Sequence, residues 1–140
     1  AETSIVHGDY RLDNMVLKNN QVMGILDWEL STLGHPIADF SYHCLSWRTQ
    51  EAFWDQAKLK ELGVPSEKEY MDMYCENTGK DLSKNWEFYM AFNMFKIAGI
   101  LQGILGRVRD GTASSKHAED RGMMVYPLSE AAWNTIIENF

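Results

Sequence analysis

The feature that most constrains the fold is a pair of short apolar runs, 15–18 and 22–27, separated by Asn19-Asn20-Gln21. Asparagine tolerates the positive φ angles that a tight turn requires. The segment 15–27 is therefore predicted to form a β-hairpin. A further apolar run, 4–7, predicts a short buried strand before it.

From Pro36 onward the pattern is typical of helices, and Pro36 itself suits the first turn of one. The expected helices cover 36–48, 51–62, 66–77, 84–109 and 116–138, with a loop over 110–115. Gly63 ends the second helix, the capping box Ser66–Glu69 opens the third, and Ser83 caps the fourth. Pro127 kinks or splits the last helix. The helix 84–109 is apolar on most sides, which is typical of a central core helix. The predicted fold class is α+β, mainly α, with a small β-hairpin followed by a helical bundle.

Composition excludes some classes of function. The chain has 140 residues, 45% of them hydrophobic, which fits one globular domain. A net charge of −7 argues against a nucleic-acid partner, because phosphate backbones require a basic surface. No apolar run reaches the ~18 residues of a membrane span. Cys44 and Cys75 lack CxxC spacing, which favours free thiols in a reducing, cytoplasmic compartment.

A polar stretch, His7–Asn14 with the sequence HGDYRLDN, lies between the first strand and the hairpin. If Asn20-Gln21 form the hairpin loop, Asn14 lies directly opposite Asp27, and if Asn19-Asn20 form it, the two are diagonal neighbours. Asp9 lies five residues before Asn14. The hairpin therefore predicts that carboxylate and amide oxygens converge.

Such hard oxygen ligands favour Mg²⁺ over zinc, and Mg²⁺ shares its shell with water and phosphates. This predicts a metal-assisted reaction on a phosphorylated substrate. Two simpler interpretations stay open, since Asp and Asn are common turn residues and a carboxylate here can cap a helix.

HGDYRLDN followed by ILDWE resembles the catalytic core of the aminoglycoside phosphotransferase family, a branch of the kinase-like fold. Protein kinases carry H-R-D-L-x-x-x-N and D-F-G in these two places. His7-Gly8-Asp9 matches the first motif and Asp27-Trp28-Glu29 the second. The strings ELSTLGHPIADFSY and GTASSKHAEDRG resemble the subfamily of kinase domains joined to acyl-CoA dehydrogenases.

The resemblance implies a role for each matched residue. Asp9 would be the catalytic base, and Asn14 and Asp27 would bind Mg²⁺ and, through it, the phosphates of ATP. Arg11, the second catalytic candidate, would either bind the transferring γ-phosphate or pair with Asp13 on the surface.

Supporting residues are expected around this loop. His7 would hold the loop through hydrogen bonds rather than transfer protons. Asp39 would either bond the loop backbone or simply favour the first turn of its helix. Glu29 would either reach a metal-bound water or be solvated.

The resemblance also implies a domain assignment. Residues 1–140 would be the C-terminal catalytic and substrate lobe, and no glycine-rich loop or strand lysine of a nucleotide-binding lobe lies upstream. The chain alone is expected to be an inactive fragment, with the missing N-terminal lobe as its partner, and exposed apolar surface would favour a homodimer.

The full-length protein would be an ATP- and Mg²⁺-dependent small-molecule kinase acting on a hydroxyl, either aminoglycoside-like or hydroxyacyl-CoA-like. The short segment between Asp27 and Pro36 leaves no room for a regulatory activation loop, which argues against a protein kinase. A non-catalytic kinase-like binding module and a metal-dependent hydrolase are the alternatives.

Two further residue sets have alternative interpretations. A basic group would bind an anionic acceptor or be a solvated face: Arg107, Arg109, Lys116 and Arg121. An aromatic group would belong to the core rather than a pocket: Trp47, Trp54, Trp86 and Tyr89.

Overall fold

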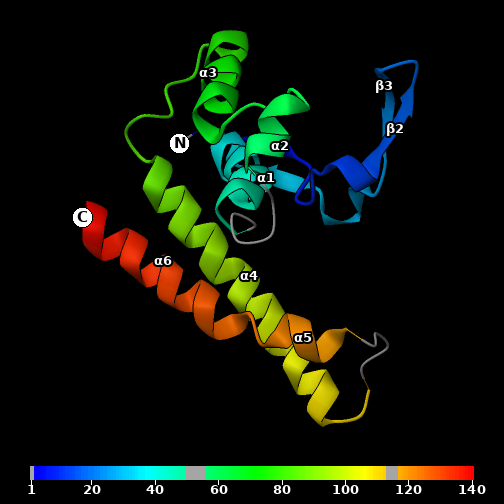
Figure 1. Cartoon of the computed structure of the whole chain (residues 1–140), viewed down its shortest axis with the longest axis vertical. Coiled ribbons are helices and arrows are strands. Elements are labelled where there is room, and N and C mark those ends of the chain that lie inside the picture. Colours follow the sequence, from blue (N-terminus) through cyan, green and yellow to red (C-terminus); the bar gives the residue numbers. More distant parts are fainter. Residues whose placement is uncertain (1, 50–55, 113–116) are drawn as a thin grey trace. The chain divides into compact units, whose positions relative to one another are not determined.

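A computed structural model describes residues 2–49, 56–112 and 117–140. The chain divides into two compact units, Ala1–Lys84 and Asn85–Phe140, which are treated in turn (Figure 1). The first unit contains all the described strands and the second is helical. The predicted fold class, mainly helical with a small hairpin, is confirmed, while the assignment of 1–140 to a single lobe stays a prediction.

Four short strands form two antiparallel pairs in the first unit. β1 (Ser4–Val6) pairs with β4 (Thr32–Gly34), and β2 (Met15–Lys18) pairs with β3 (Gln21–Ile25). The predicted hairpin is therefore present, and it extends away from the helices of the first unit (Figure 1). β4 was not predicted; its segment Thr32-Leu33-Gly34 contains a single large apolar residue and so lacks the apolar run that indicated β1. Two 3₁₀ turns, η1 (Leu12–Asn14) and η2 (Trp28–Leu30), follow the first strand and the hairpin respectively.

The hairpin turn consists of Asn19 and Asn20, whose φ angles are 50° and 59°. Both residues adopt the left-handed backbone conformation, and a turn built from two such residues matches the twist of the paired strands. Lys18 consequently lies opposite Gln21. This is the second of the two expected registers, and Gln21 belongs to the strand instead of the loop.

A β-bulge then changes the register. Leu17 lies opposite Val22, but Val16 lies opposite Gly24, so Met23 is the extra residue. At the base of the hairpin the Leu26 N–H donates to the Asn14 carbonyl at 2.8 Å. Asp27 is thus one residue beyond the backbone partner of Asn14, and neither directly opposite nor two positions away.

Three helices complete the first unit: α1 (Pro36–Thr49), α2 (Gln56–Glu61) and α3 (Glu67–Thr78). The predicted start of α2 lies outside the described residues. Gly63 ends α2 with φ 77°, and the Val64 N–H donates to the Leu59 carbonyl at 3.0 Å. The predicted capping box of α3 is present, because Ser66 and Glu69 bond each other's backbone amides.

Aromatic side chains join α1 to α3. Phe40 stacks on Tyr74 with centroids 3.9 Å apart, and Trp47 stacks on Tyr70 at 5.0 Å. Arg48 adds an ion pair to Glu67 at 2.8 Å. The two cysteines are free as predicted, and burial raises the pKa of the fully buried Cys44, which keeps that thiol protonated.

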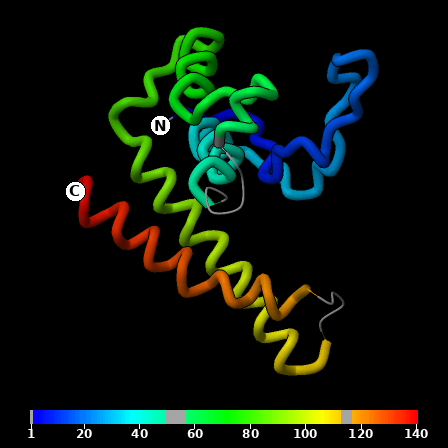
Figure 2. The backbone as a smooth tube through the Cα atoms, in the orientation of Figure 1, coloured from blue at the N-terminus to red at the C-terminus, as the bar shows by residue number. Residues whose placement is uncertain are grey.

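The second unit contains α4 (Trp86–Arg109), α5 (Ala118–Gly122) and α6 (Val125–Asn139). α4 and α6 run side by side in opposite directions (Figure 2). Met90 and Met94 of α4 and Leu128 of α6 are buried. The prediction that α4 is a central core helix holds for its buried side only, since Phe95 on the same helix is 69% exposed. By length and composition alone α4 would suit a membrane span, a property that core helices of soluble proteins share.

The ends of the second-unit helices correct two predictions. Ser83 does not cap α4; its hydroxyl bonds Asp81 at 2.6 Å and the cap position is Asn85. The last helical stretch is split before Pro127, which is the third residue of α6. Proline is tolerated there because first-turn amides have no intrahelical partner. Trp54, Lys116 and part of the predicted loop 110–115 lie outside the described residues.

Candidate active site

The loop 7–11 connects β1 to η1, and Asp39 of α1 binds two of its backbone amides. The His7 N–H donates to Asp39 Oδ2 at 2.9 Å, and the Gly8 N–H donates to Oδ1 at 2.8 Å. Asp39 lies in the first turn of α1, where a carboxylate is also favoured by the helix dipole. Of the two roles expected for Asp39, the structure shows the bond to the loop backbone.

The His7 ring connects this loop to the end of the hairpin. Its Nε2 lies 2.8 Å from the Leu26 carbonyl oxygen, and its Nδ1 lies 3.3 Å from the Asp9 amide nitrogen. A carbonyl only accepts and an amide N–H only donates, so Nε2 carries the proton and Nδ1 accepts. His7 is buried at 4% exposure. It therefore holds the loop through hydrogen bonds, as predicted.

Asn14 holds Asp9 from the other side. Its Nδ2 donates to the Asp9 backbone carbonyl at 2.9 Å and to Asp9 Oδ2 at 3.1 Å. Because both partners are acceptors, the bonded atom must be the amide nitrogen. The carbonyl oxygen of the Asn14 side chain is consequently the atom suited to a cation. The structure thus brings together two of the predicted site residues.

Asp27 follows β3 and precedes η2, with φ 64° and ψ 55°. This left-handed conformation is uncommon for residues other than glycine, and such outliers concentrate at functional sites. The Asp27 side chain is exposed. Backbone pairing of Leu26 with Asn14 brings the Asp27 backbone to the Asn14 end of the loop. Its role as a second metal ligand stays a prediction.

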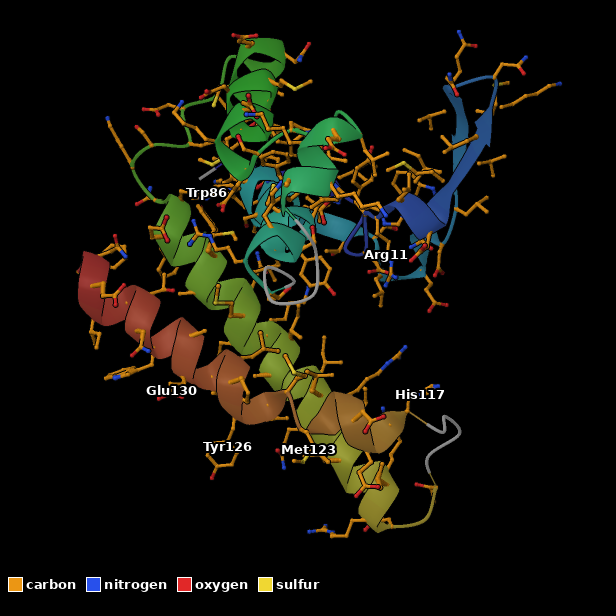
Figure 3. The ribbon with its side chains drawn as sticks, viewed as in Figure 1. Arg11, Trp86, His117, Met123, Tyr126 and Glu130 are labelled. Carbon is orange, nitrogen blue, oxygen red and sulfur yellow. The ribbon has the colours of Figure 1, made fainter. Side chains whose placement is uncertain are left out.

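Arg11 forms an ion pair with Asp13, and both side chains are exposed (Figure 3). The hydrogen bond to Asp13, with a further contribution from the charge of Asp9, raises the pKa of Arg11. The pairing is the one that the surface interpretation expected. The alternative role of Arg11, binding a γ-phosphate, stays a prediction.

Sequence reasoning missed three residues beside this loop. His43 Nδ1 lies 2.9 Å from the Tyr10 carbonyl oxygen, and the Tyr70 hydroxyl lies 3.2 Å from His43 Nε2. Burial first, and then the charge of Asp9, raise the pKa of Tyr42. Asp39 and His43 are four residues apart on one helical face, and this spacing was the signal that could have identified His43.

The donor set fits Mg²⁺ bound together with phosphates. Within residues 2–49, 56–112 and 117–140, no three His, Cys, Asp or Glu side chains come together as a metal cluster. Asn14 and Asp27 offer hard oxygens, and Mg²⁺ commonly takes one or two protein ligands with waters and phosphate oxygens for the rest. A zinc centre would need a nitrogen- or sulfur-rich set instead.

One residue of the predicted basic group, Arg109, has an acidic neighbour in the structure, and so does the nearby His117. Arg109 lies 3.5 Å from Asp110, and His117 lies 3.7 Å from Asp120, with all four side chains mostly exposed (Figure 3 labels His117). The exposed Arg109–Asp110 pair agrees with the interpretation of this group as a solvated face. Of the aromatic residues, Trp86 is buried. Trp47 borders a pocket of about 690 Å³ between the end of α1, α2 and α3.

The chain is similar to several known proteins. The family model described as "Phosphotransferase enzyme family" matches residues 1–74. The chain is 42% identical to acyl-CoA dehydrogenase family member 10 of Mus musculus over 94% of the chain and 13% of that protein. It is 38% identical to family member 11 of Homo sapiens over 92% of the chain and 17% of that protein.

A crystal structure from Ralstonia eutropha JMP134, provisionally described as an aminoglycoside phosphotransferase, is 49% identical. It superposes with a TM-score of 0.87 over 97% of this chain and 43% of that protein. The chain therefore spans less than half the length of each of these three proteins. The matched region includes Asp9, Asn14, Asp27 and Asp39, and on this ground the chain belongs to the phosphotransferase enzyme family.

Proposed function

We propose that the protein, in its full-length form, is an ATP- and Mg²⁺-dependent phosphotransferase that acts on a hydroxyl group of a small molecule. The observation that carries the proposal is the fixed position of Asp9. Its amide bonds His7, and its carbonyl and carboxylate bond Asn14. A base held from both sides is what positioning catalysis requires.

Asp9 acts on the acceptor hydroxyl. As the acceptor oxygen forms its bond to the γ-phosphorus of ATP, the bond from that phosphorus to the β–γ bridging oxygen breaks. The hydroxyl proton passes to the Asp9 carboxylate, and ADP leaves. The Asn14 amide, donating to Asp9 Oδ2 at 3.1 Å, leaves Oδ1 to face the acceptor. General-base contributions of this kind amount to about 10²–10⁴-fold.

Asn14 and Asp27 would hold the divalent ion through their side-chain oxygens. Mg²⁺ held there would neutralise part of the charge of the ATP phosphates. Arg11, cationic and exposed at the same loop, would exchange its partner Asp13 for the transferring phosphoryl group. An arginine suits this role because its planar donors match phosphate oxygens.

Two acceptor classes are supported by different relatives. The likeness to acyl-CoA dehydrogenase family members 10 and 11 supports a hydroxyacyl-CoA. The likeness to the Ralstonia protein supports an aminoglycoside. We propose a cytoplasmic enzyme with an N-terminal nucleotide-binding lobe as the partner of this region. The exposed apolar side chains of the hairpin and of α4 support the proposal of a homodimer.

The test uses the full-length protein, [γ-³²P]ATP and MgCl₂ with either kanamycin or a 3-hydroxyacyl-CoA as acceptor. We expect label to appear in one acceptor, and Asp9→Asn to lower the rate by 10²-fold or more. Asp72→Asn is the matched control, because it changes an exposed acid of α3 paired with Lys68. ATP hydrolysis that needs no acceptor and survives Asp9→Asn would contradict the proposal.

A further inference from the structure

We infer that His43 and Tyr70 are positioning residues for the loop that carries Asp9. His43 binds the backbone carbonyl of Tyr10, the residue after Asp9, and Tyr70 orients His43. The inference rests on the proposed function, since it concerns the placement of the proposed base. Neither residue belongs to the motifs that relate the chain to its family.

The hydrogen bonds define one arrangement of the His43 ring. The Tyr10 carbonyl, 2.9 Å from Nδ1, can only accept, so Nδ1 carries the proton. Nε2 is then the acceptor for the Tyr70 hydroxyl at 3.2 Å. Tyr70 therefore fixes the tautomer in which His43 donates to the loop, much as outer partners of a histidine fix its orientation in other sites.

Aromatic packing keeps the imidazole in this orientation. Its centroid lies 5.3 Å from the Tyr10 ring and 5.6 Å from the Tyr70 ring. Trp47 stacks on Tyr70 at 5.0 Å and its indole N–H donates to the Pro65 carbonyl at 2.9 Å. His43, Tyr70 and Trp47 thus form a continuous row of packed side chains. The row is hydrogen-bonded to the Tyr10 carbonyl at one end and to the Pro65 carbonyl at the other.

The consequence for Asp9 follows from the backbone. His7 bonds the Asp9 amide, Asn14 bonds the Asp9 carbonyl, and His43 bonds the carbonyl of the next residue, Tyr10. The two peptide groups after Asp9 are therefore held by side chains from different elements. Release of the Tyr10 carbonyl would let the peptide rotate and would displace the Asp9 carboxylate. Displacements of about 1 Å lower rates by as much as 10²-fold.

The experiment compares three variants of the full-length protein. His43→Phe keeps an aromatic ring but removes the donor, whereas His43→Asn supplies an amide nitrogen close to the position of Nδ1. Tyr70→Phe removes only the hydroxyl. His117→Asn is the control, because His117 is an exposed histidine of the second unit.

We expect His43→Phe to lower kcat about tenfold with the KM for ATP changed less than twofold. His43→Asn should recover most of kcat, and Tyr70→Phe should lower it about threefold. Hydrogen exchange of a peptide covering residues 7–14 should be faster in His43→Phe and restored in His43→Asn. The control should match the parent protein in each measurement.

Two results would overturn the inference. One is a parental kcat and exchange rate in His43→Phe, and the other is a His43→Asn variant no better than His43→Phe. If His43→Phe does not fold, the Tyr70→Phe and His43→Asn measurements decide. Absence of Asp9-dependent transfer in the parent protein would reject the proposed function instead, and the hydrogen-exchange comparison would still test the role of His43.

Discussion

Asp39 Oδ1 accepts the Gly8 amide at 2.8 Å, while its other carboxylate oxygen accepts the preceding amide at 2.9 Å. One side chain at the start of α1 thus satisfies two successive backbone donors of the loop that carries Asp9. The loop conformation depends on a carboxylate, since an amide or hydroxyl side chain cannot offer two acceptors of this geometry.

Asp39→Asn should therefore weaken both stability and activity. It replaces one acceptor by an NH₂ group that faces a backbone N–H, and an unsatisfied donor costs about 1–3 kcal/mol. Equilibrium denaturation of the full-length protein should show this loss, together with a reduced kcat. Asp72→Asn, at an exposed ion pair, should leave the midpoint unchanged. Equal midpoints for the two variants would show that Asp39 does not fix the loop.

Gly8→Ala should be more destabilising than Gly63→Ala. Both glycines are left-handed, with φ 85° and 77°, so alanine pays a similar conformational cost of about 1 kcal/mol at each. A Cβ at Gly8 would lie 2.7 Å from the Leu30 carbonyl oxygen, whereas Gly63 has nothing within 4 Å. The difference between the two unfolding free energies isolates the steric contact. Similar unfolding free energies would mean that the Leu30 backbone moves away from the added Cβ at little energetic cost.

Stability should fall at acidic pH partly through His43. Burial lowers the pKa of His43 below its ordinary 6.5, although the Tyr10 bond and the charge of Asp39 act in the opposite direction. The unfolded chain therefore takes up the proton first as the pH falls. The stability that the neutral His43 ring contributes is fully present above about pH 6.5. It is lost as the pH falls through the pKa of His43 in the folded protein.

Melting temperatures at pH 8 and pH 5.5 test this linkage. From pH 8 to pH 5.5 the melting temperature of the parent protein should fall further than that of His43→Asn, because the variant has no titratable group at this position. Asp39, whose charge acts on His43, is present in both proteins, and burial raises the pKa of Tyr70 further above this range. A difference of zero between the two proteins would contradict the assignment.

Two glycines of the second unit should respond in opposite directions. A Cβ at Gly122 would lie 2.2 Å from Leu105, so Gly122→Ala forces α5 away from α4 and should be destabilising. Gly99, inside α4, has nothing within 4 Å, and Gly99→Ala should stabilise the helix by about 0.5–1 kcal/mol. Thermal unfolding of both variants measures the effect. A stabilising Gly122→Ala would contradict the close packing of α4 and α5.

Local signals explain which parts of the fold the sequence predicts. The hairpin and the Ser66–Glu69 capping box depend on neighbouring residues, and the sequence predicts both, although it leaves Asn19-Asn20 as one of two alternatives for the hairpin turn. The β1–β4 pair and the bulge at Met23 depend on contacts across the chain. The cap of α4 was misassigned because Ser83 instead bonds Asp81, a local alternative that serine commonly adopts.

The candidate site divides in the same way. Asp9 and Asn14 could be proposed because their spacing matches a known motif, whereas Asp39 was proposed through the family resemblance alone. The bond between His43 and Tyr70 joins residues 27 positions apart, and no spacing pattern reveals it. The sequence also could not predict that Asp27 lies one residue past the backbone partner of Asn14, because that position results from the bulge.

The central claim is that Asn14 and Asp27 jointly hold the divalent ion beside Asp9. Electron paramagnetic resonance of Mn²⁺ titrated into the full-length protein with ADP tests it most directly, with Asp72→Asn as the control. We predict that Asn14→Ala and Asp27→Asn each weaken Mn²⁺ binding tenfold or more, while the control binds as the parent protein does. Unchanged Mn²⁺ affinity in both site variants would contradict the claim.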